Sequence, residues 1–135
     1  PTLTLGGTAD ITTPVDPQST FAFEFISARP RYRVDVRAAG HNSFTNVCDI
    51  ADALLGIGLP IDLLEFLLGS LEEGCVPDLI PVEEAQRLTK RYAVAFLQRF
   101  VARDPRYQRF LTPGRSASEP DVLYFQLPGG GRSRR

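Results

Sequence analysis

Two short segments of alternating polar and apolar residues, separated by a helical segment, constrain this fold most. Thr2 to Leu5 alternate before a Gly-Gly pair, and residues 31–37 alternate before Ala-Ala-Gly-His, a pattern typical of strands that stop at turns. Asp16 followed by Pro17 is typical of a helix start, and apolar residues follow at helical spacing. The order strand, helix, strand predicts an α/β fold with parallel pairing through a right-handed crossover.

The second strand has one apolar and one charged face, as expected at the margin of a sheet. Tyr32, Val34 and Val36 alternate there with charged residues. Two strands alone make a poor parallel sheet, so we expect further strands to come from an upstream segment. The chain contains no methionine and begins with Pro1, and we interpret it as a fragment or a processed product.

Three further helices are predicted after the second strand. Apolar residues fill 50–59 and 61–71, and the Gly and Pro residues between them favour two short helices over one. Pro81 opens a longer helix, 82–103, with a broad apolar face. We expect the apolar stretch 54–71 to cover the sheet edge, or alternatively to shape the acyl side of a pocket. The aromatic residues expected in the core are Phe21, Phe23, Phe25, Phe96 and Phe100.

Length and charge exclude several classes of protein. With 135 residues the chain has room for one domain, and a net charge of −1 argues against nucleic-acid binding. The most apolar stretch is interrupted by Pro60, Asp62 and Glu65, so we expect no transmembrane segment. We assign residues 1–112 to the α/β domain and residues 113–135 to an extension with a basic, flexible tail.

Asp10 and His41 each follow a predicted strand by a few residues. Because ligands collect at the carboxyl ends of parallel strands, both side chains are expected to point into one crevice. A carboxylate that holds an imidazole fixes its tautomer and leaves the other ring nitrogen free to accept a proton. Alternatively, Asp10 is a turn residue and His41 a satisfied loop or core histidine.

The residues around this pair resemble the α/β-hydrolase superfamily. Its acid loop is similar to the segment from Leu3 to Val15, LTLGGTADITTPV. Its histidine loop is similar to residues 39–44, AGHNSF, in which the histidine follows Asp10 by 31 positions. They are most similar to the dienelactone-hydrolase and lipase-like branch, which includes cutinase-like polyester hydrolases and platelet-activating-factor acetylhydrolase. The resemblance implies the C-terminal portion of the fold, with its last two parallel strands and flanking helices. Asp10 would be the triad acid and His41 the general base of a carboxylic ester hydrolase that needs no cofactor.

The chain departs from that family because it has no Gly-x-Ser-x-Gly nucleophile motif. The nearest sequence, Gly114 to Ser118, lacks the second glycine and lies after the histidine. We therefore expect the serine and the oxyanion hole on a missing N-terminal part, which would be a partner of this chain beside a small-molecule or lipid ester. The chain alone would be inactive.

Three alternatives remain open from the sequence. The chain could be a noncatalytic α/β binding or interaction module, or one chain of an assembly whose sheet a partner completes. A third alternative keeps the hydrolase fold but changes the leaving group, as in an amidase or a halide-releasing enzyme.

Cys48 and Cys75 are the two cysteines of the chain and allow one intramolecular pairing. A disulfide between them predicts an extracellular or periplasmic protein, whereas two buried thiols would indicate the cytoplasm. Cys48 is also weighed as a catalytic nucleophile, but the resemblance places the nucleophile of this fold upstream of the histidine, on another strand.

Overall fold

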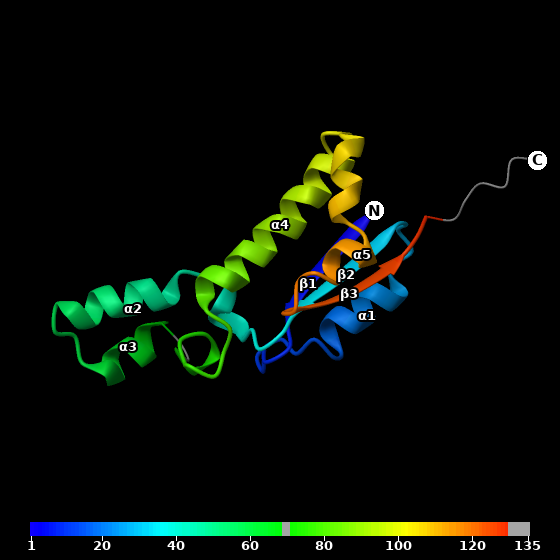
Figure 1. Cartoon of the computed structure of the whole chain (residues 1–135). Helices are drawn as coiled ribbons and strands as arrows, with labels where there is room; N and C mark the ends of the chain where they lie inside the picture. The colour runs from blue at the N-terminus through cyan, green and yellow to red at the C-terminus, as the bar shows by residue number, and fades with distance from the viewer. Residues whose placement is uncertain (69–70, 130–135) are drawn as a thin grey trace, which may run out of the picture.

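The centre of the molecule is a three-stranded mixed sheet. The computed structural model describes residues 1–68 and 71–129. Strand β2 (Arg31–Val36) lies between β1 (Thr2–Gly7), to which it is parallel, and β3 (Val122–Leu127), to which it is antiparallel (Figure 1). The predicted α/β class and the parallel pairing of the first two strands are confirmed.

Strand β3 lies within residues 113–135, for which the sequence predicts only an extension and a tail. This segment also contains the short helix α5 (Pro113–Ser116). The antiparallel strand corrects the expectation that the described sheet would consist of two parallel strands. Its sequence, VLYFQL, carries no alternation that would have identified it. The basic end of the predicted tail, residues 130–135, falls outside the described residues.

Strand β2 is a central strand, which corrects its predicted place at the sheet margin. Its apolar face packs against α4, and its charged face is covered as well, because Arg31 and Asp35 are buried. Arg33 donates to the Asp35 carboxylate with Nη2 2.6 Å from Oδ2, and its guanidinium lies 4.6 Å from the centre of the Phe125 ring. The Arg31 guanidinium instead donates to the backbone carbonyl oxygens of Glu24 and Ile26. The ion pair of Asp35 and the hydrogen bonds of Arg31 compensate the burial of these two charged side chains.

Two helices cover the faces of the sheet. On one face, α4 (Val82–Phe100) packs Leu88, Tyr92 and neighbouring small residues onto β2, and the 3₁₀ helix η3 (Pro105–Phe110) folds back against α4. On the other face lies α1 (Gln18–Phe25), which contacts β1 and β2. The apolar core lies between α4 and the sheet, and α1 contributes no residue to it among the described residues.

The expected burial of Phe21 and Phe25 is wrong. They are 62% and 68% exposed and stack on each other with ring centres 4.6 Å apart. The inner side of α1 instead carries the buried Ser19, because the sheet face opposite it presents charged rather than apolar side chains. Phe96 is partly buried against the core, as predicted.

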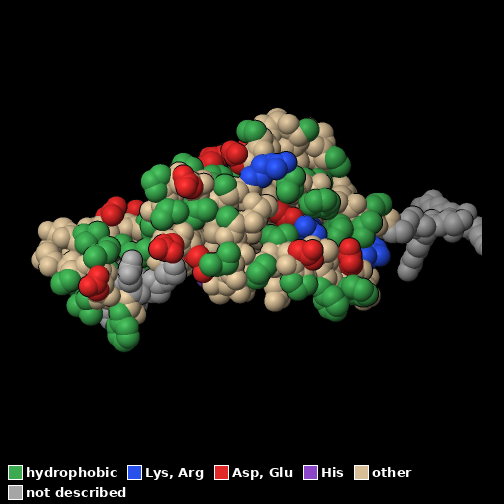
Figure 2. Space-filling view, turned by 90° about the horizontal axis from the view of Figure 1, so that it is seen from below, with side chains coloured by type: hydrophobic (Ala, Val, Ile, Leu, Met, Phe, Trp, Pro, Cys, Tyr) green, Lys and Arg blue, Asp and Glu red, His purple; other side chains and the backbone are tan. Residues whose placement is uncertain are grey.

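A helical hairpin projects from the body of the molecule. It consists of α2 (Val47–Gly56) and α3 (Ile61–Leu68), which confirms two helices in this stretch (Figure 1). The hairpin extends away from the sheet, so it does not cover the sheet edge as expected, and Phe66 is 84% exposed. Hydrophobic and acidic side chains lie side by side on its surface (Figure 2). Within residues 1–68 and 71–129, no helix combines the length and apolar character needed to span a bilayer.

Candidate functional site

Backbone hydrogen bonds join the two loops that follow β1 and β2. We call residues 8–14 the acid loop and residues 37–44, which include the 3₁₀ helix η1 (His41–Phe44), the histidine loop. The amide of Ala9 donates to Ala39 O at 3.0 Å, and the amide of Ala38 donates to the Thr8 hydroxyl at 2.9 Å. Parallel pairing of β1 with β2 therefore brings both loops to the same edge of the sheet.

Asp10 and His41 meet at this edge. The Asp10 Oδ2 atom lies 3.1 Å from His41 Nδ1, which confirms the predicted proximity of the two side chains. The carboxylate side chain is 7% exposed, whereas the imidazole is 44% exposed. The acid is thus buried behind an imidazole that is open to solvent. Their catalytic roles stay a prediction.

Thr13 completes the surroundings of the Asp10 carboxylate. Its amide donates to Oδ1 at 2.6 Å and its hydroxyl donates to Oδ2 at 2.8 Å. Burial by itself would raise the pKa of Asp10, but the bonds from Thr13 and from His41 outweigh it and hold that pKa below its ordinary value. Asp10 is therefore a carboxylate at neutral pH.

The carboxylate determines which nitrogen of His41 carries the proton. An ionised carboxylate only accepts hydrogen bonds, so the bond at Nδ1 requires an Nδ1–H donor, and in the neutral imidazole this leaves Nε2 with a free lone pair. The Thr13 hydroxyl lies 3.3 Å from the same Nδ1 and donates its hydrogen bond to Asp10, so it faces the protonated nitrogen of the ring and not the basic one. Nε2 is the nitrogen that can act as a base toward another group.

An open cavity of about 330 Å³ adjoins the imidazole. Residues from three elements line it, and Leu5 and Phe44 supply apolar surface beside the polar pair. Within the described part of the chain, the hydrogen-bond partners of the His41 ring are Asp10 and Thr13. The arrangement can take up a proton at Nε2, but no nucleophile is bonded to that nitrogen among these residues. The lining residues are Thr4, Leu5, Gly6, Asp10, Thr13, Gln18, Ser19, His41 and Phe44.

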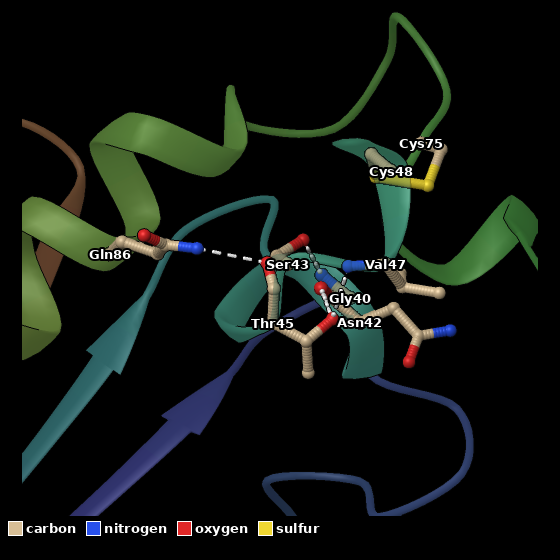
Figure 3. The surroundings of a disulfide bond; sticks show 8 residues. All are labelled: Gly40, Asn42, Ser43, Thr45, Val47, Cys48, Cys75 and Gln86. Atoms are coloured by element: carbon tan, nitrogen blue, oxygen red, sulfur yellow. Dashed lines mark hydrogen bonds between the residues drawn. A yellow bond between two sulfur atoms is a disulfide. The ribbon is translucent and has the colours of Figure 1, made fainter. Parts of the chain in front are cut away.

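The predicted pairing of Cys48 with Cys75 is confirmed (Figure 3). The bond joins the first turn of α2 to the chain that follows the hairpin, with Cα atoms 5.5 Å apart. Because its sulfur is held in this disulfide, Cys48 offers no thiolate nucleophile. Directly after the histidine loop, the side-chain amide of Gln86 donates to Thr45 O at 2.9 Å (Figure 3).

Ser116, the serine of the rejected Gly-x-Ser sequence, belongs to the core. It is buried, and its hydroxyl oxygen accepts a hydrogen bond of 2.9 Å from Tyr92. Its place in α5 and its bond to Tyr92 agree with its rejection as a nucleophile.

Sequence reasoning missed two residues of the site, Thr13 and Glu73. Thr13 could have been found, because an Asp that bonds the backbone a few residues later is a known turn signal. Glu73 accepts hydrogen bonds from the acid loop although 61 positions separate it from Thr12, and no local pattern announces such a contact.

No group of three or more His, Cys, Asp or Glu side chains within the described ranges is arranged to hold a metal ion. Comparison of the chain with models of protein families, with curated proteins and with solved structures finds no match.

Proposed function

We propose that this chain supplies the acid and the base of a Ser–His–Asp triad in a carboxylic ester hydrolase. The single observation that carries the proposal is the 3.1 Å bond between the buried Asp10 carboxylate and His41 Nδ1, beside a cavity. In this proposal a serine on an additional N-terminal segment faces Nε2. The isolated chain is then inactive.

The proposed chemistry moves one proton through His41. Nε2 takes the proton of the serine hydroxyl as its oxygen attacks the ester carbonyl, and the imidazolium then protonates the leaving alcohol. A water molecule then attacks the acyl-serine ester while Nε2 takes its proton, and the carboxylic acid is released as the serine regains its proton. Asp10 stays ionised throughout and stabilises the imidazolium, and its lowered pKa supports that role.

The cavity supports a small-molecule or lipid ester as substrate. Leu5 and Phe44 lie beside the imidazole, and apolar side chains with a few polar groups are the usual lining of such sites. The Cys48–Cys75 disulfide supports an extracellular or periplasmic location.

The sheet has room for the segment that would bring the serine. Among the described strands, β1 pairs on one side with β2, and its other edge has no strand partner. A parallel strand added there would carry its own C-terminal loop to the edge where Asp10 and His41 lie. The same open edge suits the alternative of a noncatalytic module or an assembly completed by a partner chain.

The test is ester hydrolysis by a protein that joins this chain to its upstream reading frame. With p-nitrophenyl butyrate, His41→Ala and Asp10→Asn should each lower kcat by about 10⁴-fold, because the base or its orientation is lost. Asp49→Asn, which changes an exposed acid in the first turn of α2, is the matched control and should leave kcat unchanged.

Near-normal hydrolysis by His41→Ala would contradict the proposal. An upstream frame without a Gly-x-Ser-x-Gly sequence, together with no hydrolysis by the wild type, would favour the noncatalytic module instead.

A further inference from the structure

The chain that follows the hairpin packs against both loops of the site. We call residues 71–75 the bracket segment; it contains the 3₁₀ helix η2 (Leu71–Glu73), then Gly74 and Cys75. The Glu73 side chain in this segment is buried although it is a carboxylic acid. Burial of a carboxylate is unfavourable unless donors compensate it, so its partners identify what it does.

Among the described residues, the donors to the Glu73 carboxylate belong to the acid loop. The amides of Ile11 and Thr12 both donate to Oε2 at 3.2 Å, and the Thr12 hydroxyl donates to Oε1 at 2.7 Å. The next amide along the chain, that of Thr13, donates to Asp10 instead. Three consecutive amides are thus divided between two carboxylates, and this division defines the turn that presents Asp10 to His41.

The bracket segment also leaves no free space against the histidine loop. A Cβ atom on Gly40 would lie 2.3 Å from Glu73 O, and one on Gly74 would lie 2.6 Å from the Asn42 Cβ. Contacts this close require glycine at both positions. Cys75 then ties the segment to Cys48 at the start of α2. The two loops are consequently held by one short piece of chain.

Electrostatic attraction does not explain why the Glu73 carboxylate lies beside the acid loop. The Thr12 hydroxyl and the amides of Thr12 and Ile11 lower its pKa, although burial and the negative charge of Asp10 act in the opposite direction. A second anion near Asp10 costs electrostatic energy. The hydrogen bonds that Glu73 accepts from the acid loop offset that cost. We conclude that Glu73 contributes to the structure through these hydrogen bonds.

We propose that Glu73 is a positioning residue, which holds the acid loop so that Asp10 Oδ2 meets His41 Nδ1. The consequence for catalysis rests on the proposed function, whereas the consequence for the geometry of the pair does not. Loss of the Glu73 carboxylate should free the acid loop and weaken the Asp10–His41 bond. The neutral imidazole would then shift from the Nδ1–H form toward the Nε2–H form that it prefers in water.

The test uses the imidazole nitrogens of this chain as the probe. His41 is its single histidine, so ¹⁵N NMR of the neutral ring reports one tautomer without assignment problems. Wild type should show the Nδ1–H form and Glu73→Ala a mixture of both forms. Glu73→Gln, whose amide oxygen still accepts from the backbone, should keep most of the Nδ1–H form. Glu72→Ala, which changes the exposed neighbour, is the matched control and should match wild type.

A second readout is hydrogen exchange at the Ile11 and Thr12 amides. In Glu73→Ala both should exchange about tenfold faster or more, because each loses a bond to a charged acceptor. If Glu73→Ala does not fold, Thr12→Val removes the hydroxyl bond alone and should accelerate the same amides more weakly while α4 stays protected.

The two proposals fail in different ways. An Nε2–H tautomer in the wild type would remove the Asp10–His41 bond and with it the proposed function. An Nδ1–H tautomer that is unchanged in folded Glu73→Ala would overturn the positioning role of Glu73 and leave the proposed function standing. For Thr12→Val, unchanged exchange of both amides would likewise overturn the role.

Discussion

The body of the molecule and its helical hairpin use opposite means to hold their shape. In the body, Val34 of β2 and Leu88 and Tyr92 of α4 are buried in one core. In the hairpin, Ala51 and Leu64 are buried but Ile57 and Phe66 are exposed. Burial of apolar surface therefore stabilises the body. The hairpin depends on contacts between its own two helices and on the disulfide at its base.

Charge also distinguishes the hairpin and the segments that flank it from the rest of the chain. Between Arg37 and Arg87 the sequence contains no Lys or Arg, and it contains four Asp and five Glu. Only one of these acids, Glu73, reaches the candidate site by a hydrogen bond among the described residues. The bracket segment that follows the hairpin, rather than the hairpin surface, therefore contacts the candidate site.

The largest effect on stability is expected in the core of the body. Tyr92→Ala should lower the free energy of unfolding by about 3–5 kcal/mol, because it leaves a large cavity between α4 and the sheet. Tyr92→Phe, the control, removes only the bond to Ser116 and should cost about 1 kcal/mol. Urea unfolding measures both. Equal losses for the two variants would mean that the hydroxyl, and not burial, stabilises the body.

A smaller and local effect is expected from the disulfide. Replacing Cys48 and Cys75 together by Ser opens a loop with a sequence separation of 27. The chain-entropy relation gives a loss of about 3.5 kcal/mol as an upper figure. Hydrogen exchange should accelerate in α2 and α3 while α4 stays protected. Equal acceleration in α4 would show that hairpin and body unfold as one unit.

The smallest effect is expected on the hairpin surface. Phe66→Glu should change the free energy of unfolding by no more than about 0.5 kcal/mol, because the ring is already exposed. The matched control is Leu64→Ala on the same helix, where the buried side chain should cost about 2–5 kcal/mol. Thermal unfolding of the two variants measures the difference. A large loss in Phe66→Glu would mean that the exposed face is packed in solution.

Several features of the fold were predictable because they depend on neighbouring residues. Alternation identified β1 and β2, glycine and proline separated α2 from α3, and Pro81 preceded α4. Two cysteines allow one intramolecular pair. The proximity of Asp10 and His41 also followed, because parallel strands end at the same edge of a sheet.

Other features depended on which surfaces meet. The alternation of β2 predicted a solvated charged face, but pairing with β3 and cover by α1 bury Arg31 and Asp35. Helical spacing placed Phe21 and Phe25 on one side of α1 without deciding whether that side faces the sheet. Periodicity defines the faces of an element, whereas the neighbouring elements decide which face is buried.

The sequence by itself determined the local elements and, through the order of strands, the meeting of one carboxylate with one imidazole. The tertiary structure alone decided that Glu73 would bind the amides of Ile11 and Thr12. The physical reason is distance along the chain: a contact across 62 positions depends on how the hairpin returns to the sheet edge, and no short-range pattern encodes that path.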